Sequence, residues 1–346
     1  MLGKNIRYYR LRNRLTKKAL AERCGVSAMS ITHYENDQRT PDTNTLRKIA
    51  DAMDIRVIDF IRARNSSLKF QHGDFRKHAG LTQSMQQCVR EMTEEYFDRF
   101  FEIVDLLPDN VLPPPLSLHQ LTPLASNEEN ARRLRHFLHL PSIGPTGNLV
   151  EHMEDLGIPV FMLDLDIHDF FGMNGCVNDR PFIVLSDHMT PERMRTTLLH
   201  EVVHIAFNWE HMNEQEIETK ATEIAGAVLF PKNDALRELG PHRDGISRDM
   251  DRICIEYGIS KSLLAVRAEI CGILSKEALI RYFKYVNRRF GKTHEPSLIS
   301  KERPFLFEQL VYQGVTTGLI TPQKGGELLG IPTSDVEAAC QMENDF

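Results

Sequence analysis

The sequence predicts a multidomain protein with an α+β fold that is mainly α-helical and contains one small β-sheet. The chain has 346 residues, more than one compact domain usually holds. Helical patterns dominate both ends, whereas the apolar pattern of strands is confined to segments 157–163 and 181–186. We predict four parts: an all-α domain at 1–64, a helical and proline-rich linker at 65–126, a core containing the sheet at 127–235, and a helical carboxyl-terminal domain at 236–346.

The amino-terminal part consists of short amphipathic helices separated by turn residues. Gly25 separates two of these helices, and glycine tolerates the positive φ that a tight helix-turn-helix requires. Residues 1–62 contain 13 Lys and Arg against 7 Asp and Glu, whereas the remainder contains 29 against 41. A small basic domain attached to an acidic body is typical of a module that binds phosphates.

These residues resemble the XRE-type (Cro/repressor-like) DNA-binding domain. Its expected positions are filled by Leu20-Ala21, Gly25-Val26-Ser27, Ile31, Tyr34-Glu35 and Pro41. The resemblance implies double-stranded DNA as partner, with candidate contacts at Lys17, Ser27, Ala28, Met29, Ser30, Thr32 and His33. Lys17 stands where the family often has Gln. The second helix of the motif contains neither Arg nor Gln, so its sequence does not predict which bases it would prefer. Such domains also serve as protein-interaction modules, which is the alternative.

The predicted linker begins with a helix and ends in a spacer. Met85 to Val104 has an apolar side rich in aromatic residues, which more often packs against other helices than binds a ligand. The following segment, Leu107 to Pro115, is rich in proline and is expected to act as a semi-rigid spacer.

The core contains the sequence His200-Glu201-Val202-Val203-His204. In a helix, residues four apart lie on one face, so both imidazoles can bind one metal ion, and Glu201 can act on a metal-bound water. The flanking residues 193–207 contain no Gly or Pro, and Thr190-Pro191 is a helix start. The alternative is a buried helix with two hydrogen-bonded histidines.

A catalytic zinc site needs a third protein ligand and one open position. The segment 213–231 begins with a run of carboxylates and continues as an apolar helix that ends at Pro231. Glu218 borders the apolar face and is the favoured ligand, with Glu223 and Glu214 as alternatives.

The stretch from Leu156 to Pro231 resembles the ImmA/IrrE family of metallopeptidases. The resemblance rests on Gly172, Pro181-Phe182-Ile183, the expected helix with His200, Glu201 and His204, the segment from Glu218 to Ala225, and Leu229-Phe230-Pro231. It implies a zincin-like core with zinc as cofactor, His200, His204 and Glu218 as metal ligands, and Glu201 as the catalytic residue. Two positions depart from the family pattern: Lys220 replaces a frequent Glu, and Thr222 replaces Asn or Asp, which would weaken support of a ligand histidine.

The resemblance further implies an endopeptidase whose substrate is a protein, expected to be a transcriptional repressor in a stress, prophage or mobile-element response. His188 and His211 are the candidates for stabilising the oxyanion. The alternative is a transcription regulator or antitoxin-like protein whose zinc domain is a non-proteolytic sensor or scaffold.

The carboxyl-terminal part has helix–Gly–helix patterns at 253–267 and, more loosely, at 318–332. Neither is notably basic, so packing or partner binding is favoured over DNA contact. No run of 18 apolar residues or signal peptide is recognisable, which predicts a cytoplasmic protein that does not enter a membrane. The six cysteines form no CxxC and are expected to be reduced, and a homodimer is compatible with the sequence.

Overall fold

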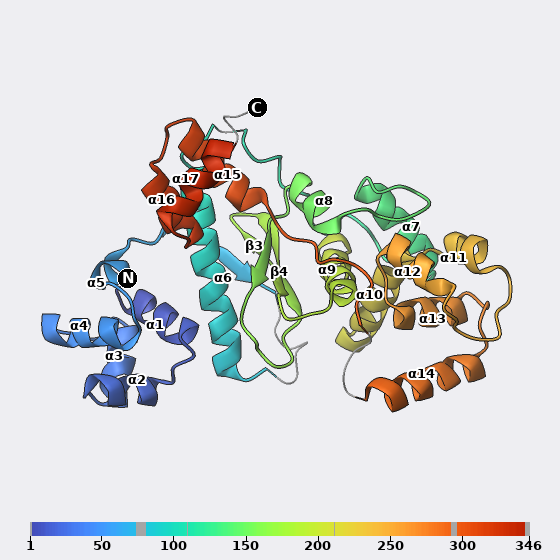
Figure 1. Ribbon diagram of the computed structural model, residues 1–346, viewed down its shortest axis with the longest axis horizontal. Helices are drawn as coiled ribbons and strands as arrows, with labels where there is room; N and C mark the ends of the chain where they lie inside the picture. Colours follow the sequence, from blue (N-terminus) through green and yellow to red (C-terminus); the bar gives the residue numbers. More distant parts are fainter. Residues whose placement is uncertain (1, 74–80, 109, 211, 292–295, 343–346) are drawn as a thin grey trace. The chain divides into compact units, whose positions relative to one another are not determined.

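The computed structural model confirms a mainly helical α+β fold with one four-stranded sheet (Figure 1). It describes residues 2–73, 81–108, 110–210, 212–291 and 296–342. The chain forms two compact units: unit 1 comprises 1–70, 75–111 and 307–346, and unit 2 comprises 71–74 and 112–306. The predicted linker and the predicted carboxyl-terminal domain are thus each divided between the units. The four-part division stays a prediction.

Unit 1 begins with five short helices. They are α1 (Leu2–Arg12), α2 (Lys17–Cys24), α3 (Ala28–Glu35), α4 (Thr43–Ala52) and α5 (Val57–Ile61). Thr16 and Ser27 cap α2 and α3, because each side chain accepts a hydrogen bond from a backbone N–H in the first turn. Gly25 ends α2 with φ 69° and ψ 33°, the left-handed conformation that glycine adopts without strain. Ile6, Leu20, Ile31, Ile49 and Phe60 are fully buried between these helices.

A buried carboxylate fixes the helix-turn-helix. Glu35, at the end of α3, is 2% exposed and accepts hydrogen bonds from Nε and Nη2 of Arg10 on α1. Arg7 Nε and Lys17 Nζ each lie 3.8 Å from Glu35 Oε2. Three cations from α1 and α2 therefore compensate one buried charge on α3, which holds the three helices in register.

The rest of unit 1 is helical. It contains α6 (Gln83–Val104), most of α15 (Leu306–Thr316), α16 (Pro322–Leu329) and α17 (Thr333–Met342). Phe97 and Phe100 on α6 are fully buried, and Phe307 contacts the rings of Tyr96 and Phe100. The aromatic side of α6 is a packing face, as its sequence predicts.

Unit 2 contains the sheet. Its strands are β1 (Phe70–His72), β2 (Val160–Leu163), β3 (Gly172–Val177) and β4 (Arg180–Ser186), in the order β1-β3-β4-β2. β2 runs parallel to β4 with Val160 opposite Ile183, and β3 runs antiparallel to β4 with Gly172 opposite Leu185. Asn178 and Asp179 form the two-residue hairpin loop, both with positive φ, as the right-handed twist of the strands favours. The sequence patterns predict β2 and β4 but neither β1 nor β3.

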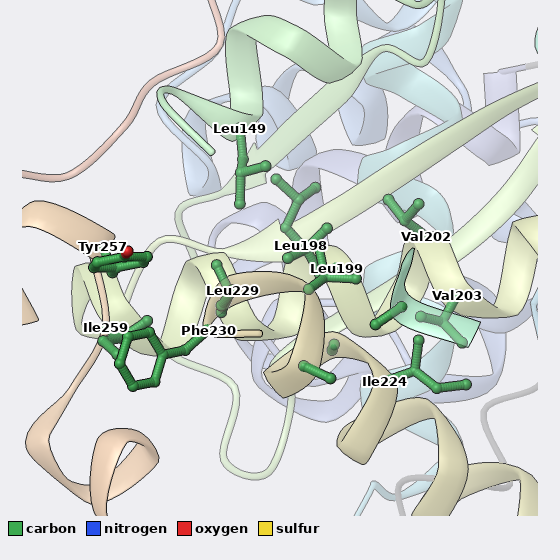
Figure 2. Close-up of a cluster of buried hydrophobic side chains, with 14 of the residues drawn as sticks. Leu149, Leu198, Leu199, Val202, Val203, Ile224, Leu229, Phe230, Tyr257 and Ile259 are labelled. Carbon is green, nitrogen blue, oxygen red and sulfur yellow. The ribbon is translucent and has the colours of Figure 1, made fainter. Parts of the chain in front are cut away.

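Eight helices are described in unit 2. They are α7 (Asn127–Phe137), α8 (Leu149–Asp155), α9 (Pro191–Ala206), α10 (Glu214–Leu229), α11 (Lys232–Leu239), α12 (Met250–Tyr257), α13 (Lys261–Ile270) and α14 (Lys276–Phe290). One face of α9 packs on β3 and β4, and α10 packs along α9. Leu198, Leu199 and Val203 of α9 meet Ile224 and Leu229 of α10 in a fully buried apolar cluster (Figure 2). Among the helices of the described residues, none is long and apolar enough to cross a membrane.

Within unit 2, the segment 297–305 and the start of α15 are held by two buried carboxylates. Glu192 accepts hydrogen bonds from Ser297 Oγ at 2.9 Å and from the N–H of Leu298 at 2.8 Å. Glu154, on α8, accepts hydrogen bonds from the N–H groups of Phe305 and Leu306 at 3.0 and 3.2 Å. Burial raises the pKa of Glu154 to about 7, although these backbone donors oppose the shift.

We predict that Glu154→Gln removes a pH dependence from the stability of unit 2. Because the pKa of Glu154 is higher in the folded state than in the unfolded state, its stabilising contribution is present below about pH 4.5 and is lost as the pH rises through about 7. Between pH 5 and pH 8, the wild type should therefore lose about 2–3 kcal/mol relative to the variant. Urea unfolding followed by emission of Trp209, the single tryptophan of the chain, measures this difference.

The matched control is Glu151→Gln, which changes an exposed carboxylate on the same helix. It should leave the pH dependence of the wild type unchanged. Parallel pH profiles for the wild type and Glu154→Gln would contradict the assignment.

Candidate metal centre

Helix α9 presents two histidines on one face. Its first turn contains Pro191, whose fixed φ suits a helix start, and Glu192, whose charge suits the amino-terminal end of the helix dipole. His200 and His204 are separated by four residues, and their ring centroids lie 4.7 Å apart. Val202 and Val203 between them are fully buried, so packing fixes the rotation of the helix that brings both imidazoles to the same side.

Helix α10 supplies a carboxylate to these histidines. His200 Nε2 lies 3.1 Å from His204 Nε2 and 3.1 Å from Glu218 Oε2, and His204 Nε2 lies 3.3 Å from Glu218 Oε1. The three side chains are a group that could hold a metal ion. Tetrahedral zinc with bonds of about 2.0–2.1 Å places its ligand atoms about 3.3–3.4 Å apart. The donor set and its spacing therefore fit a zinc ion with three protein ligands.

The structure separates Glu218 from the other carboxylates of its helix. Glu223 accepts a hydrogen bond from Asn127 Nδ2 of α7. Glu214 is an exposed residue of the first turn of α10 and is not in the cluster. Of the three sequence candidates for the third ligand, Glu218 alone is brought to the histidines.

Thr222 supports one of the candidate ligands. Its Oγ1 donates a hydrogen bond to the carbonyl oxygen of Glu218 at 2.9 Å and lies 3.3 Å from His200 Nδ1. A hydroxyl has one proton, so we assign Thr222 Oγ1 as the acceptor of the Nδ1–H of His200. In this tautomer the lone pair of His200 is on Nε2, the atom that faces the cluster. Thr222 thus supplies an oxygen acceptor at the position where the ImmA/IrrE family usually has Asn or Asp.

A residue of the sheet holds the side chain of Glu201 in place. Its side chain is 6% exposed, and its Oε2 accepts a hydrogen bond from Asn174 Nδ2 at 2.7 Å. Asn174 lies in the middle of β3, and its carbonyl accepts a hydrogen bond from the N–H of Gly73, directly after β1. Asn174 is not among the residues that the sequence predicts for the site, because the two glycines of β3 conceal its strand pattern. A polar residue between Met173 and Gly175, close upstream of an apolar strand, was the only available signal.

Gly172 allows β3 to pack closely against α9. A Cβ at Gly172 would lie 2.8 Å from Thr197 Cγ2 of α9 and 3.1 Å from Leu185 Cδ2 of β4. Any side chain at this position would push the strand away from the helix. Since β3 contains Asn174, the glycine also sets the distance over which Asn174 reaches Glu201.

Trp209 lies beside His204. The indole of Trp209 lies 6.3 Å from the ring of His204, and its buried Nε1 has no hydrogen-bond partner among the described residues. His188 pairs with Asp164 through a 3.1 Å contact, whereas His211 lies outside the described residues. Burial raises the pKa of Cys176, which is not part of the His–Glu cluster.

The candidate DNA contacts lie on and around α3. Met29 is 63% exposed, and Ala28 beside it is also exposed. The Ser27 and Ser30 hydroxyls bond each other at 2.9 Å, and Thr32 Oγ1 donates to the Ala28 carbonyl at 3.1 Å. The remaining two, Lys17 and His33, are half-buried, and the ammonium of Lys17 is drawn to Glu35.

Two separate parts of the chain match known protein families. A family model described as helix-turn-helix matches residues 6–60, and the model of the IrrE N-terminal-like domain matches residues 153–269. The chain joins an XRE-type helix-turn-helix domain to an IrrE-like domain. A similar protein is the HTH-type transcriptional regulator ImmR of Bacillus subtilis (strain 168), with 26% identity over 94 residues, 27% of this chain and 69% of the regulator. No solved structure matches the chain.

We predict that Thr222→Val weakens zinc binding by the IrrE-like domain. Valine keeps the shape of threonine but removes the oxygen that accepts from His200 Nδ1–H, and loss of such support typically costs about 10–100-fold in metal affinity. Thr222→Asn supplies a side-chain oxygen again and should restore most of the affinity. Competition with a chromogenic chelator at neutral pH measures the dissociation constants.

Thr219→Val is the matched control. Thr219 is exposed on the same helix and makes the same kind of bond to a backbone carbonyl, from Oγ1 to Gln215 at 2.9 Å, but is not part of the cluster. Equal losses for Thr219→Val and Thr222→Val would mean that helix stability, rather than the His200 contact, controls the affinity.

Proposed function

We propose that this protein is a DNA-binding transcriptional regulator with zinc-dependent endopeptidase activity. The observation that carries the proposal is the convergence of His200 Nε2, His204 Nε2 and the Glu218 carboxylate within 3.1–3.3 Å, beside a buried glutamate that is not a ligand. Three ligands leave a fourth tetrahedral position open, which distinguishes catalytic zinc sites from structural ones. The proposed ligands are His200, His204 and Glu218.

The residues around the metal have separate tasks in peptide hydrolysis. When bound, zinc supplies Lewis acidity, which polarises a carbonyl and makes water a stronger acid. Glu201 acts as the general base: it takes the proton of the attacking water and later gives it to the leaving amine. Asn174 Nδ2 donates to Glu201 Oε2 and orients the carboxylate, so that the other oxygen is left for the proton. Thr222 keeps the lone pair of His200 on the metal side.

We expect the amino-terminal domain to bind DNA and so to place the peptidase activity in gene regulation. This domain belongs to the helix-turn-helix class and its net charge is positive. ImmR, which is 26% identical to this chain over 94 residues, is a transcriptional regulator. The proposed DNA contacts are Lys17, Ser27, Ala28, Met29, Ser30, Thr32 and His33. The proposed substrate is a regulatory protein, such as a repressor whose cleavage releases stress, prophage or mobile-element genes.

The peptidase proposal is tested with Glu201→Gln. The variant should bind one equivalent of zinc like the wild type, since Glu201 is not a ligand, and should cleave about 10²–10⁴-fold more slowly, since a general base is lost. Zinc is measured by metal analysis, and cleavage by mass spectrometry of new termini in a library of unstructured peptides. Glu214→Gln, which removes an exposed carboxylate of α10, is the control.

The outcomes separate the peptidase from a sensor or scaffold. Stoichiometric zinc in both proteins without new termini from either would favour the non-proteolytic reading. Absence of zinc, or equal cleavage by the wild type and Glu201→Gln, would refute the peptidase.

The DNA-binding proposal is tested with a charge on the exposed face of α3. Met29→Glu should greatly weaken binding to duplex DNA, because a carboxylate would face the phosphates. Ile58→Glu is a close match as control, since Ile58 of α5 is 61% exposed and Met29 is 63% exposed. Fluorescence anisotropy of a labelled duplex gives the affinities, which should fall with salt. Equal binding by the two variants, or no salt dependence, would contradict the proposal.

A further inference from the structure

Unit 2 repeats the turn of the amino-terminal helix-turn-helix. Helix α12, like α2, has eight residues and ends at a left-handed glycine, Gly258 with φ 63° and ψ 43°. The N–H of Ile259 donates to the Cys254 carbonyl at 2.9 Å, as that of Val26 donates to Ala21 at 3.0 Å. Ser260 then caps α13 in the way that Ser27 caps α3. Helices α12 and α13 therefore share the local geometry of α2 and α3.

The second helix of this repeat, α13, packs against other parts of unit 2. Leu264, Ala265 and Ala268 of α13 are buried, and Arg267 donates from Nε to the Phe230 carbonyl at 3.0 Å. Leu263 packs against Gly226 of α10, where an added Cβ would lie 3.3 Å from its Cδ1. The positions of α13 that correspond to the exposed positions of α3 are therefore not available to contact a groove of DNA.

The helix that follows, α14, has a strongly basic exposed face. It contains five Lys and Arg and one Glu in 15 residues, and it buries Ala278 and Tyr282. The five cations are Lys276, Arg281, Lys284, Arg288 and Arg289, all exposed. Residues 281, 284 and 288 follow a three- and four-residue spacing, which places them in one stripe along the helix.

Most of this charge is not compensated within the described residues. Lys284 and Arg288 have no ion pair there. Lys276 and Arg281 interact electrostatically with Glu277 and contribute to lowering its pKa, and Arg281 also donates to the backbone carbonyl of Asp244 at 3.2 Å. Arg289 donates to the Tyr285 hydroxyl, and its guanidinium lies 5.8 Å from the centroid of that ring. Other cations of unit 2, such as Lys261 and Arg267, are paired with carboxylates. The basic stripe thus stands out in an otherwise acidic part of the chain.

We propose that the exposed face of α14 is a second DNA-contact surface, which binds the phosphate backbone of duplex DNA without reading its sequence. Uncompensated cations on an exposed helix complement a polyanion, and releasing the counterions of the phosphates provides the free energy. Duplex DNA is the polyanion that the helix-turn-helix domain of the same chain is expected to bind. Covalent connection of the two surfaces raises the effective concentration of DNA at α14 once α3 is bound.

The stripe has the dimensions that backbone contacts require. From residue 281 to residue 288 the helix rises about 10 Å, and the flexible side chains extend this reach, so at least two phosphates of one strand can be contacted. Contacts to phosphates and sugars make up about half to two-thirds of the hydrogen bonds between proteins and DNA, and Lys284, at the centre of the stripe, is a point charge rather than a planar fork.

The test uses the full chain and a labelled random-sequence duplex of about three helical turns. Lys284→Gln combined with Arg288→Gln should lower the slope of log affinity against log salt concentration by about 1.8, since each lost phosphate contact contributes about 0.9. At 0.1 M salt the affinity should fall roughly tenfold or more. Fluorescence anisotropy between 50 and 300 mM salt, roughly the range in which such slopes are measured, gives both quantities.

The matched control combines Arg248→Gln and Arg252→Gln, two exposed cations of the same unit outside α14. An unchanged slope in the α14 variant, or an equal fall in the control, would overturn the proposal. An α14 variant that binds DNA like the wild type but loses affinity for an acidic protein would also overturn it, in favour of a protein partner.

The proposal does not stand or fall with the helix-turn-helix domain. In the Met29→Glu background, a further fall of the slope on changing Lys284 and Arg288 supports α14, whether or not Met29→Glu alone has an effect. If Met29→Glu alone changes nothing while the α14 variant does, the proposed role of α3 fails and that of α14 remains.

Discussion

The packing of α10 along α9 is the contact on which the candidate site depends. Leu198, Leu199 and Val203 on one helix meet Ile224 and Leu229 on the other, and all are fully buried. This apolar interface fixes both the rotation and the offset of the two helices. As a result, side chains on the adjoining, less buried faces meet at one point: two imidazole nitrogens four residues apart and one carboxylate from the facing helix. A shift of one residue in either helix would rotate its ligand by about 100° and separate the donors.

Around this interface, each functional side chain has a partner on another element. Thr222 of α10 orients His200 of α9, and Asn174 of β3 orients Glu201 of α9. Gly172 and its neighbours allow β3 to lie close enough for the second of these contacts. The small sheet therefore does more than cover the apolar side of α9: it fixes the residue that is proposed to move the proton. Such cross-element support is what keeps catalytic geometry within a fraction of an ångström.

The sequence predicts those parts of the site that depend on local spacing. His200, Glu201 and His204 are recognisable because a helix repeats every 3.6 residues, and Glu218 because it borders an apolar helical face that ends at Pro231. Asn174 could not be predicted in the same way, since β3 owes its strand conformation to pairing with β1 and β4 rather than to its own residues. β1 is even less predictable, because residues 70–72 pair with a strand about 100 residues later in the chain. The amino-terminal helices were predictable for the opposite reason: caps, Gly25 and apolar spacing are all local.

The buried Glu35 network has a consequence for how DNA recognition can change. The charges that hold α1, α2 and α3 together lie on the inner side of α3, whereas Ala28 and Met29 on its outer side take no part in the buried core. Folding and recognition thus use separate faces of one eight-residue helix. Substitutions on the outer face can accumulate at little cost in stability, so related chains could acquire new operator preferences while keeping the same scaffold and the same IrrE-like domain.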